Sequence, residues 1–174
     1  MILVYLGLGS NLGRPVQYLE AGLQALQNLS NASLIAVSSI YRTKPVGGPD
    51  QDDYFNQAAL VSYSGTLEQL LNDCQAIEHS NQRVRNERWG PRTLDIDLLY
   101  SPHEASDTKS LQVPHPRLTE RLFVLAPLLE LPEADTISIN DKTLYEWAAL
   151  QHTQHIQLTH HQWNGADIVE SNKI

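Results

Sequence analysis

The sequence has almost no cysteine, since Cys74 is the one cysteine among its 174 residues. A single thiol cannot form an internal disulfide, so nothing in the composition requires an oxidising compartment. Long apolar runs are missing too, because the longest, Ile2 to Leu8, is far shorter than the ~20 residues of a membrane-spanning helix. That run also lacks the basic flank and the small-residue cleavage site of a secretory signal. We therefore expect a cytoplasmic protein without a membrane partner.

Basic residues are also scarce, with 12 Lys and Arg against 20 Asp and Glu, which gives a formal net charge of −8. An overall field of this sign argues against binding to bulk nucleic acid or to anionic membranes. It leaves anionic small ligands open, because a local basic cluster can outweigh the global sum. The length suits one domain, since single cores usually span about 100–200 residues.

The apolar residues before residue 101 predict alternating strands and helices. Helical spacing follows Pro15, and the segment Thr66-Leu67-Glu68-Gln69 has the form of a capping box that begins a second helix. The predicted strands are Met1 to Leu8, Leu34 to Arg42, Tyr54 to Ser64 and Thr93 to Tyr100. The order βαββαβ predicts an α+β fold, in which helices cover one face of a mainly antiparallel sheet.

Beyond residue 101 the pattern predicts a short strand at Leu111 to Val113 and helices near Leu118 to Leu131 and Leu144 to Leu150. We found no internal repeat and no low-complexity linker. We therefore expect one domain over residues 1–150, followed by a C-terminal extension over residues 151–174.

The extension is polar and carries four histidines. Two interpretations are open. Imidazoles three residues apart share a helical face and could bind a metal. We prefer a solvated tail, because no Cys or Asp joins these histidines at ligand spacing. The four residues are His152, His155, His160 and His161.

Asp95 and Asp97 are the sharpest local signal. In a strand they point to the same face with Cα atoms ~6.7 Å apart, while the apolar residues between and beside them fill the other face. Two carboxylates ~5 Å apart repel by under ~1 kcal/mol in water and by ~3 kcal/mol at an effective dielectric constant of ~20. Either this face is exposed to solvent, as in an ordinary acidic strand, or it holds a cation such as Mg²⁺.

Four arginines precede the acidic strand within ten positions: Arg83, Arg85, Arg88 and Arg92. Guanidinium groups bind phosphate oxygens in bidentate fashion, so a basic loop beside paired carboxylates suits a metal–nucleotide site. The alternative is a surface loop that uses arginine for solubility, with Glu87 pairing locally.

Other residues leave two interpretations open. The predicted helix places Glu78 within its apolar arc and Gln75 at the border, so Glu78 either contacts a ligand or pairs with an arginine. Tyr54 and Asn56 share a strand face that suits a flat heterocycle, or they are an ordinary core-edge tyrosine and a turn asparagine. The segment Gly7-Leu8-Gly9 lacks the lysine of a phosphate loop and the third glycine of a dinucleotide fingerprint.

Five segments in order resemble 6-hydroxymethyl-7,8-dihydropterin pyrophosphokinases, and they extend from about Ile2 to Leu150. The Arg88-to-Asp97 block, RWGPRTLDID, is the most specific. The others are Gly9-Ser10-Asn11-Leu12-Gly13, Tyr41-Arg42-Thr43, Asp53-Tyr54-Phe55-Asn56 and Val113-Pro114-His115.

The resemblance implies a ferredoxin-like, three-layer αβα sandwich. It also implies transfer of the terminal diphosphate of ATP to the pterin hydroxymethyl group, with release of AMP, in tetrahydrofolate biosynthesis. ATP is then a co-substrate, a hydroxymethyldihydropterin is the acceptor, and two Mg²⁺ ions are required. We expect a monomer with no nucleic-acid partner. Such transfers need positioning and charge neutralisation more than covalent chemistry, and we assign no general base.

The resemblance also implies site residues. Asp95 and Asp97 would hold the two Mg²⁺ ions, and with them Arg83 and Arg92 would be catalytic. The nucleotide would contact Gln75, Glu78, Arg85, Arg88, Trp89, Arg92, His115 and Arg121. The pterin would contact Thr43, Pro45, Val46, Tyr54, Asn56 and Phe123. Two positions depart from the best-known members: Pro116 stands where they have Tyr, and Gln112 where Thr is frequent.

Two other functions share parts of this pattern. A two-metal phosphohydrolase also uses paired aspartates, and it would release phosphate from ATP without a pterin. An RNA-binding module also has βαββαβ order. The net charge argues against it, and so does the lack of the run of aromatic residues with which such modules stack RNA bases.

Overall fold

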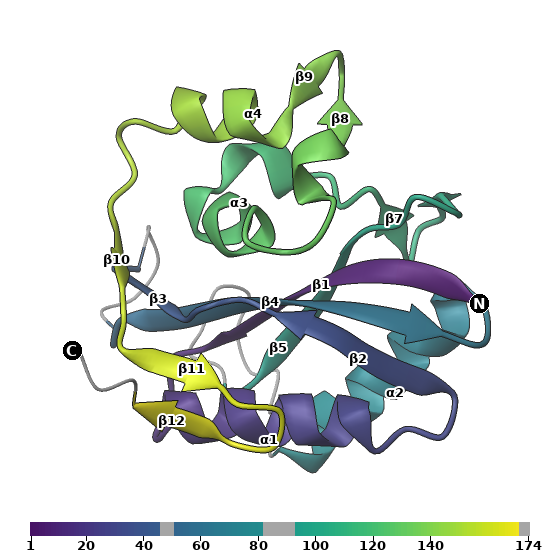
Figure 1. Ribbon diagram of the computed structural model, residues 1–174, viewed down its shortest axis with the longest axis horizontal. Coiled ribbons are helices and arrows are strands. Elements are labelled where there is room, and N and C mark those ends of the chain that lie inside the picture. The colour runs from purple at the N-terminus through teal and green to yellow at the C-terminus, as the bar shows by residue number, and fades with distance from the viewer. Residues whose placement is uncertain (46–50, 82–92, 171–174) are drawn as a thin grey trace.

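The computed structural model describes residues 1–45, 51–81 and 93–170, and it is built around a six-stranded sheet (Figure 1). The strand order is β10-β3-β4-β1-β5, with β2 also pairing with β4, and every pair is antiparallel. The strands are β1 (Ile2–Ser10), β2 (Ala32–Val37), β3 (Tyr41–Thr43), β4 (Tyr54–Tyr63), β5 (Asp95–Tyr100) and β10 (Ile156–Leu158).

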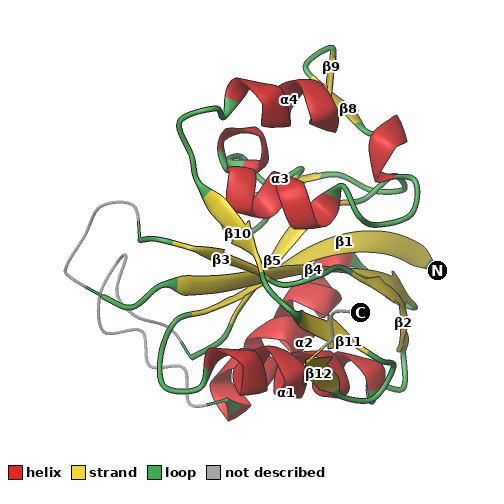
Figure 2. Ribbon diagram, turned by 60° about the vertical axis from the view of Figure 1, so that its left-hand side comes forward, coloured by secondary structure: helices red, strands yellow, loops and turns green. Residues whose placement is uncertain are grey.

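Helices cover both faces of this sheet, which gives three layers (Figures 1 and 2). One face carries α1 (Pro15–Gln27) and α2 (Leu67–Ser80), and the other carries α3 (Leu122–Leu128), on which α4 (Leu144–Leu150) packs. Two 3₁₀ turns, η1 (Leu118–Glu120) and η2 (Ala134–Thr136), flank α3. The three-layer α+β sandwich is confirmed, and the chain follows the predicted βαββαβ order with one extra strand, because the second predicted strand is divided in two.

Strand β1 is buried on both faces because two cores meet at it. Val4, Leu6 and Leu8 pack toward α1 and α2, whereas Tyr5 packs toward α3. Each core buries apolar side chains that are scattered along the chain, and this burial is the main force that holds the layers together. The site is therefore built on a strand that packs against both cores.

The structure also has three two-stranded sheets. They are β6 (Ser106–Asp107) with β7 (Gln112–Val113), β8 (Ser138–Ile139) with β9 (Lys142–Thr143), and β11 (His161–Trp163) with β12 (Ile168–Glu170). No described helix is long and apolar enough to cross a membrane.

The predicted strand Leu34 to Arg42 is two strands, β2 and β3, that pair with successive parts of β4. The break falls where side chains take over backbone hydrogen bonds. The Ser38 hydroxyl accepts from the Ala58 N–H at 2.8 Å, and Glu130 accepts from the Ser39 N–H at 2.8 Å. These contacts replace the regular ladder and bend the edge of the sheet.

The predicted helix Leu118 to Leu131 is also interrupted. Arg121 has extended backbone angles between η1 and α3. The Gln154 side chain accepts a hydrogen bond from the Leu122 N–H at 2.8 Å and donates one to the Glu120 carbonyl at 2.7 Å. A distant glutamine therefore satisfies two backbone groups at the break, so a continuous helix is not needed.

The interpretation of residues 151–174 as a solvated tail is wrong for the described part. Strand β10 pairs with β3, and the β11–β12 hairpin lies on α1, where Trp163 and Ile168 pack against the core (Figure 1). Glu20 on α1 accepts a hydrogen bond from the Ile168 N–H at 2.7 Å. The sequence does carry a signal for this hairpin, because the dipeptide Asn164-Gly165 is typical of turns and begins the four-residue loop between β11 and β12. Among the described residues no group of three or more His, Cys, Asp or Glu side chains could hold a metal ion.

Candidate active site

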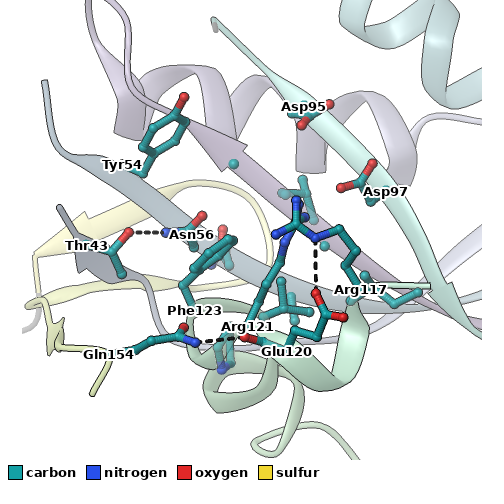
Figure 3. A pocket seen from close by; sticks show the side chains of 18 of the residues that line it. Thr43, Tyr54, Asn56, Asp95, Asp97, Arg117, Glu120, Arg121, Phe123 and Gln154 are labelled. Atoms are coloured by element: carbon teal, nitrogen blue, oxygen red, sulfur yellow. Dashed lines mark hydrogen bonds and ion pairs between the residues drawn. The ribbon is translucent and has the colours of Figure 1, made fainter. Parts of the chain in front are cut away.

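A cavity of about 420 Å³ lies on the face of the sheet that α3 covers. Figure 3 shows Tyr54, Thr43 and Asn56 at one end and the two carboxylates at the other. Seven of the residues predicted for the site line this one cavity: Thr43, Tyr54, Asn56, Asp95, Asp97, Arg121 and Phe123.

The floor of the cavity is glycine. Strand pairing aligns Asn56, Gly9 and Asp95 across β4, β1 and β5, and it aligns Gly7 with Asp97 in another row. A Cβ atom on Gly9 would lie 3.4 Å from Asn56 Oδ1, and one on Gly7 would lie 3.3 Å from a Leu99 methyl carbon. The bare backbone leaves this space for a ligand.

Sequence reasoning missed this role of the glycines, because it tested them only as a phosphate-binding motif. The available signal was their spacing of two within an apolar strand, which puts both on one face.

Asp95 and Asp97 project from β5 onto the cavity side, while Ile96 and Leu98 are buried in the core on the other side. This is the placement that strand alternation predicts. Carboxylate oxygens are the donors that hard divalent cations prefer, so the pair fits Mg²⁺. Two carboxylates would supply part of the oxygen ligands of such a cation, and water and substrate oxygens would supply the rest.

An amide and a hydroxyl meet at the opposite end of the cavity. Asn56 donates from Nδ2 to Thr43 Oγ1 at 3.0 Å, and both residues are buried. This bond fixes the orientation of the amide and sets its Oδ1 beside Gly9. Tyr54 donates from its hydroxyl to Gln51 Oε1 at 3.2 Å, and Phe123 completes this end of the lining. Pro45 follows β3 just outside the lining residues, and Val46 lies outside the described residues.

Two arginines enter the cavity from the segment before α3. Arg121 lies with its Cζ 5.7 Å from the centre of the Phe123 ring, at cation–π distance. Burial and the neighbouring Arg117 lower the pKa of Arg121, which still remains a cation at neutral pH. Arg117 pairs with Glu120 through Nε and Oε2 at 3.2 Å. Both Arg117 and Glu120 line the cavity, and sequence reasoning missed them because this segment has no regular period.

His115 lies next to these arginines, outside the lining residues. The imidazole Nδ1 of His115 accepts from the backbone N–H of Arg117 at 3.1 Å, and the backbone N–H of His115 donates to the Leu99 carbonyl at 2.8 Å. Burial and the Arg121 charge lower the pKa of His115 below its usual 6.5, and Asp95 only partly opposes them. The imidazole is therefore neutral at pH 7, and the lone pair of its Nδ1 holds the backbone of Arg117. We call residues 117–121 the arginine segment.

Glu78 and Gln75 are not brought to the cavity. Glu78 is only 4% exposed on α2, where Oε1 accepts from the Ile96 N–H at 2.7 Å, between the two aspartates. It therefore anchors β5 from behind the acidic pair, and Gln75 is exposed on the same helix. Besides Val46, five predicted residues lie outside the described part of the chain: Arg83, Arg85, Arg88, Trp89 and Arg92.

Comparison with solved structures shows the fold. The chain matches an HPPK-DHPS in complex with substrates with a TM-score of 0.65 at 12% identity, covering 86% of this chain and 45% of that one. It matches a Plasmodium falciparum HPPK-DHPS with pterin and p-hydroxybenzoate with a TM-score of 0.62 at 14% identity, covering 86% and 41%. This chain thus spans less than half the length of these solved chains.

Comparison of sequences shows the family. The 2-amino-4-hydroxy-6-hydroxymethyldihydropteridine pyrophosphokinase of Haemophilus influenzae is 41% identical over 146 residues, which are 84% of this chain and 91% of the relative. The protein of the same name from Bacillus subtilis is 44% identical over 129 residues, 74% of this chain and 77% of the relative. The family model of 7,8-dihydro-6-hydroxymethylpterin-pyrophosphokinase matches residues 5–133. The chain therefore belongs to the 7,8-dihydro-6-hydroxymethylpterin-pyrophosphokinase family.

Proposed function

We propose that this cavity transfers the terminal diphosphate of ATP to the hydroxymethyl group of 6-hydroxymethyl-7,8-dihydropterin, giving the pterin diphosphate and AMP. The reaction serves tetrahydrofolate biosynthesis. One observation carries the assignment of the reaction to this cavity. The paired carboxylates and the buried amide lie at opposite ends of one glycine floor, in a chain of the pyrophosphokinase family.

The amide end is the proposed pterin pocket. Asn56 Oδ1 lies over Gly9 and would accept a hydrogen bond from a ring or amino N–H of the pterin, since its Nδ2 is held by Thr43. The ring would stack between Tyr54 and Phe123, whose faces offer the apolar contact that flat heterocycles prefer. Backbone from Thr43 to Val46, including Pro45, would complete the pocket.

The acidic end is the proposed phosphate site. Asp95 and Asp97 would hold two Mg²⁺ ions, which would neutralise charge on the transferred group when bound. Arg121 and His115 would contact the nucleotide from the α3 side. The remaining proposed nucleotide contacts are Gln75, Glu78, Arg83, Arg85, Arg88, Trp89 and Arg92, with Arg83 and Arg92 also stabilising charge during transfer.

In the proposed reaction the pterin hydroxymethyl oxygen attacks the β-phosphorus of ATP. A new O–P bond forms, the bond from that phosphorus to the α–β bridging oxygen breaks, AMP leaves, and the hydroxyl proton passes to solvent. The chain contributes binding, orientation and exclusion of competing water, which suffice for much of the rate because phosphoryl-type transfer depends on positioning.

We further propose that the enzyme acts in the cytoplasm as a monomer. The support is that one chain supplies both ends of the cavity, and that its single cysteine, Cys74, is buried and unsuited to disulfide formation. The substrates are small molecules, and the charge of −8 disfavours a nucleic-acid partner.

A titration and an assay test this function together. We expect calorimetry to detect tight pterin binding when a non-hydrolysable ATP analogue and Mg²⁺ are present, and expect AMP to form only when ATP, Mg²⁺ and pterin are combined. Asp97→Ala should nearly abolish AMP formation while far-UV circular dichroism stays unchanged. Phosphate release from ATP without pterin would instead indicate a phosphohydrolase, and a fully active Asp97→Ala protein would overturn the metal assignment.

A further inference from the structure

The chain leaves α4, descends along the edge of the sandwich and joins the sheet as β10 (Figure 1). We call residues 151–158 the C-terminal strap. Two of its residues, Thr153 and Gln154, line the cavity, although they lie beyond residues 5–133 of the family match. The strap therefore touches the proposed pterin pocket directly.

The upper part of the strap holds the segment that carries Arg121 and Phe123. Gln154 accepts from the Leu122 N–H at 2.8 Å through Oε1 and donates to the Glu120 carbonyl at 2.7 Å through Nε2. Its Nε2 also donates to Gln151 Oε1 at 2.8 Å. One side chain thus bonds the backbone on both sides of Arg121, where the chain changes from η1 to α3.

The lower part of the strap holds the opposite wall. Strand β10 places Ile156 opposite Thr43 and Leu158 opposite Tyr41, and the Thr159 N–H donates to the Ile40 carbonyl at 2.9 Å. Thr43 in turn accepts from Asn56, the proposed pterin ligand. A single residue, His155, separates Gln154 from the paired part of the strap, so the two walls are tied together over a very short length of chain.

We propose that Gln154 is a positioning residue for the pterin pocket, because it fixes the Phe123 wall at a set distance from the Asn56 wall. The inference rests on the proposed function. A planar ring that stacks in a slot needs a slot of fixed width, and walls held in place before binding lose less entropy on binding. Without the Gln154 amide, the Leu122 N–H and the Glu120 carbonyl lose their bonds to the strap, and Phe123 loses its anchor.

The first test compares Gln154→Ala with Gln157→Ala, which removes an exposed glutamine from the same strap. We expect Gln154→Ala to raise the pterin KM about tenfold, because the Phe123 wall must then be ordered when the pterin binds. The ATP KM should rise less than the pterin KM, because Arg121 is the one proposed nucleotide contact between the two backbone groups that Gln154 bonds. Gln157→Ala should behave as the unaltered protein. Gln154→Glu keeps the acceptor for Leu122 and loses the donor to Glu120, so an intermediate pterin KM is expected.

The second test asks whether Gln154 acts through Phe123. In a double-mutant cycle with Phe123→Leu, we expect Gln154→Ala to add less than about twofold to the pterin KM, because the ring that it positions is already gone. Additive effects would overturn the proposal, and so would a Gln154→Ala protein that matches Gln157→Ala. An equal rise in the KM of ATP and of pterin, with a lower melting temperature, would indicate a merely structural role.

Failure of the proposed function is a separate result. It would be seen in the unaltered protein as no pterin-dependent formation of AMP. Calorimetric titration of the same variants with the hydroxymethylpterin would then test the strap by binding alone. Equal pterin affinity in Gln154→Ala and Gln157→Ala, or no pterin binding by any of them, would overturn the inference.

Discussion

Gly9 holds open the middle of the cavity, between the amide of Asn56 and the carboxylate of Asp95. We expect Gly9→Ala to fold normally, since its Cβ would lie 3.4 Å from Asn56 Oδ1, an ordinary contact distance. The added methyl would nevertheless occupy ligand space, so the pterin dissociation constant should rise about tenfold, the cost of displacing one hydrogen-bonded contact. Calorimetric titration and a thermal melt measure the two effects.

Gly22→Ala is the contrasting variant. A Cβ on Gly22 would lie 3.1 Å from a methyl carbon of Leu94, within the core below the sheet. Overpacking there should lower the melting temperature and leave pterin affinity unchanged. If Gly9→Ala instead lowers stability and preserves pterin affinity, the glycine floor is not a ligand surface.

His115 makes the stability of the fold, and its own bond to Arg117, depend on pH. Its pKa is lower in the folded protein than in the unfolded chain, so the unfolded chain binds more protons as the pH falls below about 6.5. His115 thus favours the fold above that pH, and its contribution is lost as the pH falls through the folded-state pKa. Protonation of Nδ1 also removes the acceptor for the Arg117 N–H.

We expect His115→Asn to lose less of its free energy of unfolding than the unaltered protein between about pH 7.5 and about pH 5.5. Urea unfolding at both pH values measures this difference. His152→Asn, which changes an exposed histidine of the strap, controls for the loss of an imidazole. Equal acid sensitivity in the His115 variant would contradict the assignment.

At the scale of elements, α2 begins at a capping box that the sequence predicts. The Thr66 hydroxyl accepts from the Gln69 N–H, and the Gln69 side chain accepts from the Thr66 N–H. We expect Thr66→Ala to lower the free energy of unfolding by about 1 kcal/mol, measured by urea unfolding. Ser80→Ala, at the other end of α2, lies outside the cap and should change stability by less than half as much. A neutral Thr66→Ala would show that packing alone holds the start of α2.

Elements that the sequence predicts correctly have a local signal. Strands β1, β4 and β5 and helices α1 and α2 follow from apolar period, capping and turn residues within a few positions. Two of the segments predicted wrongly, the break between β2 and β3 and the break before α3, depend on distant partners. Glu130 bonds Ser39 at the break between β2 and β3, and Gln154 bonds Leu122 at the break before α3. No local pattern carries those contacts.

The site residues divide in the same way, into those that a local pattern predicts and those that depend on the tertiary fold. Asp95 with Asp97, and Tyr54 with Asn56, are predictable as pairs because a strand places alternate residues on one face. That the two pairs share one cavity follows from strand order, which the sequence pattern does not contain. Arg117, Glu120 and Gln154 reach the cavity only through the tertiary fold, so nothing in their spacing identifies them.

For the whole molecule, the C-terminal region divides into two parts with different effects. The strap contacts the cavity, whereas the β11–β12 hairpin packs Trp163 and Ile168 onto the opposite layer. We expect a chain that ends at Thr159 to lose about 2 kcal/mol of unfolding free energy, since it exposes the apolar surface beneath those side chains. Its pterin KM should stay within about twofold of the full chain, because the strap is intact.

Chemical denaturation and steady-state kinetics of the shortened chain separate these effects. A large rise in pterin KM with the strap intact would show that the hairpin, and not the strap, shapes the pocket. Unchanged stability would show that Trp163 contributes nothing to the core.

The glycine floor has a consequence for inhibitors. A compound that lies on Gly7 and Gly9 meets backbone atoms, which every amino acid carries, so substitution cannot delete its contacts there. Substitution can only add a side chain, and that side chain would fill volume that the proposed substrate would occupy. Resistance arising at the floor should therefore lower the fitness of the organism, whereas resistance arising at Arg117 or Glu120 need not. Compounds directed at this strand should select escape variants least readily.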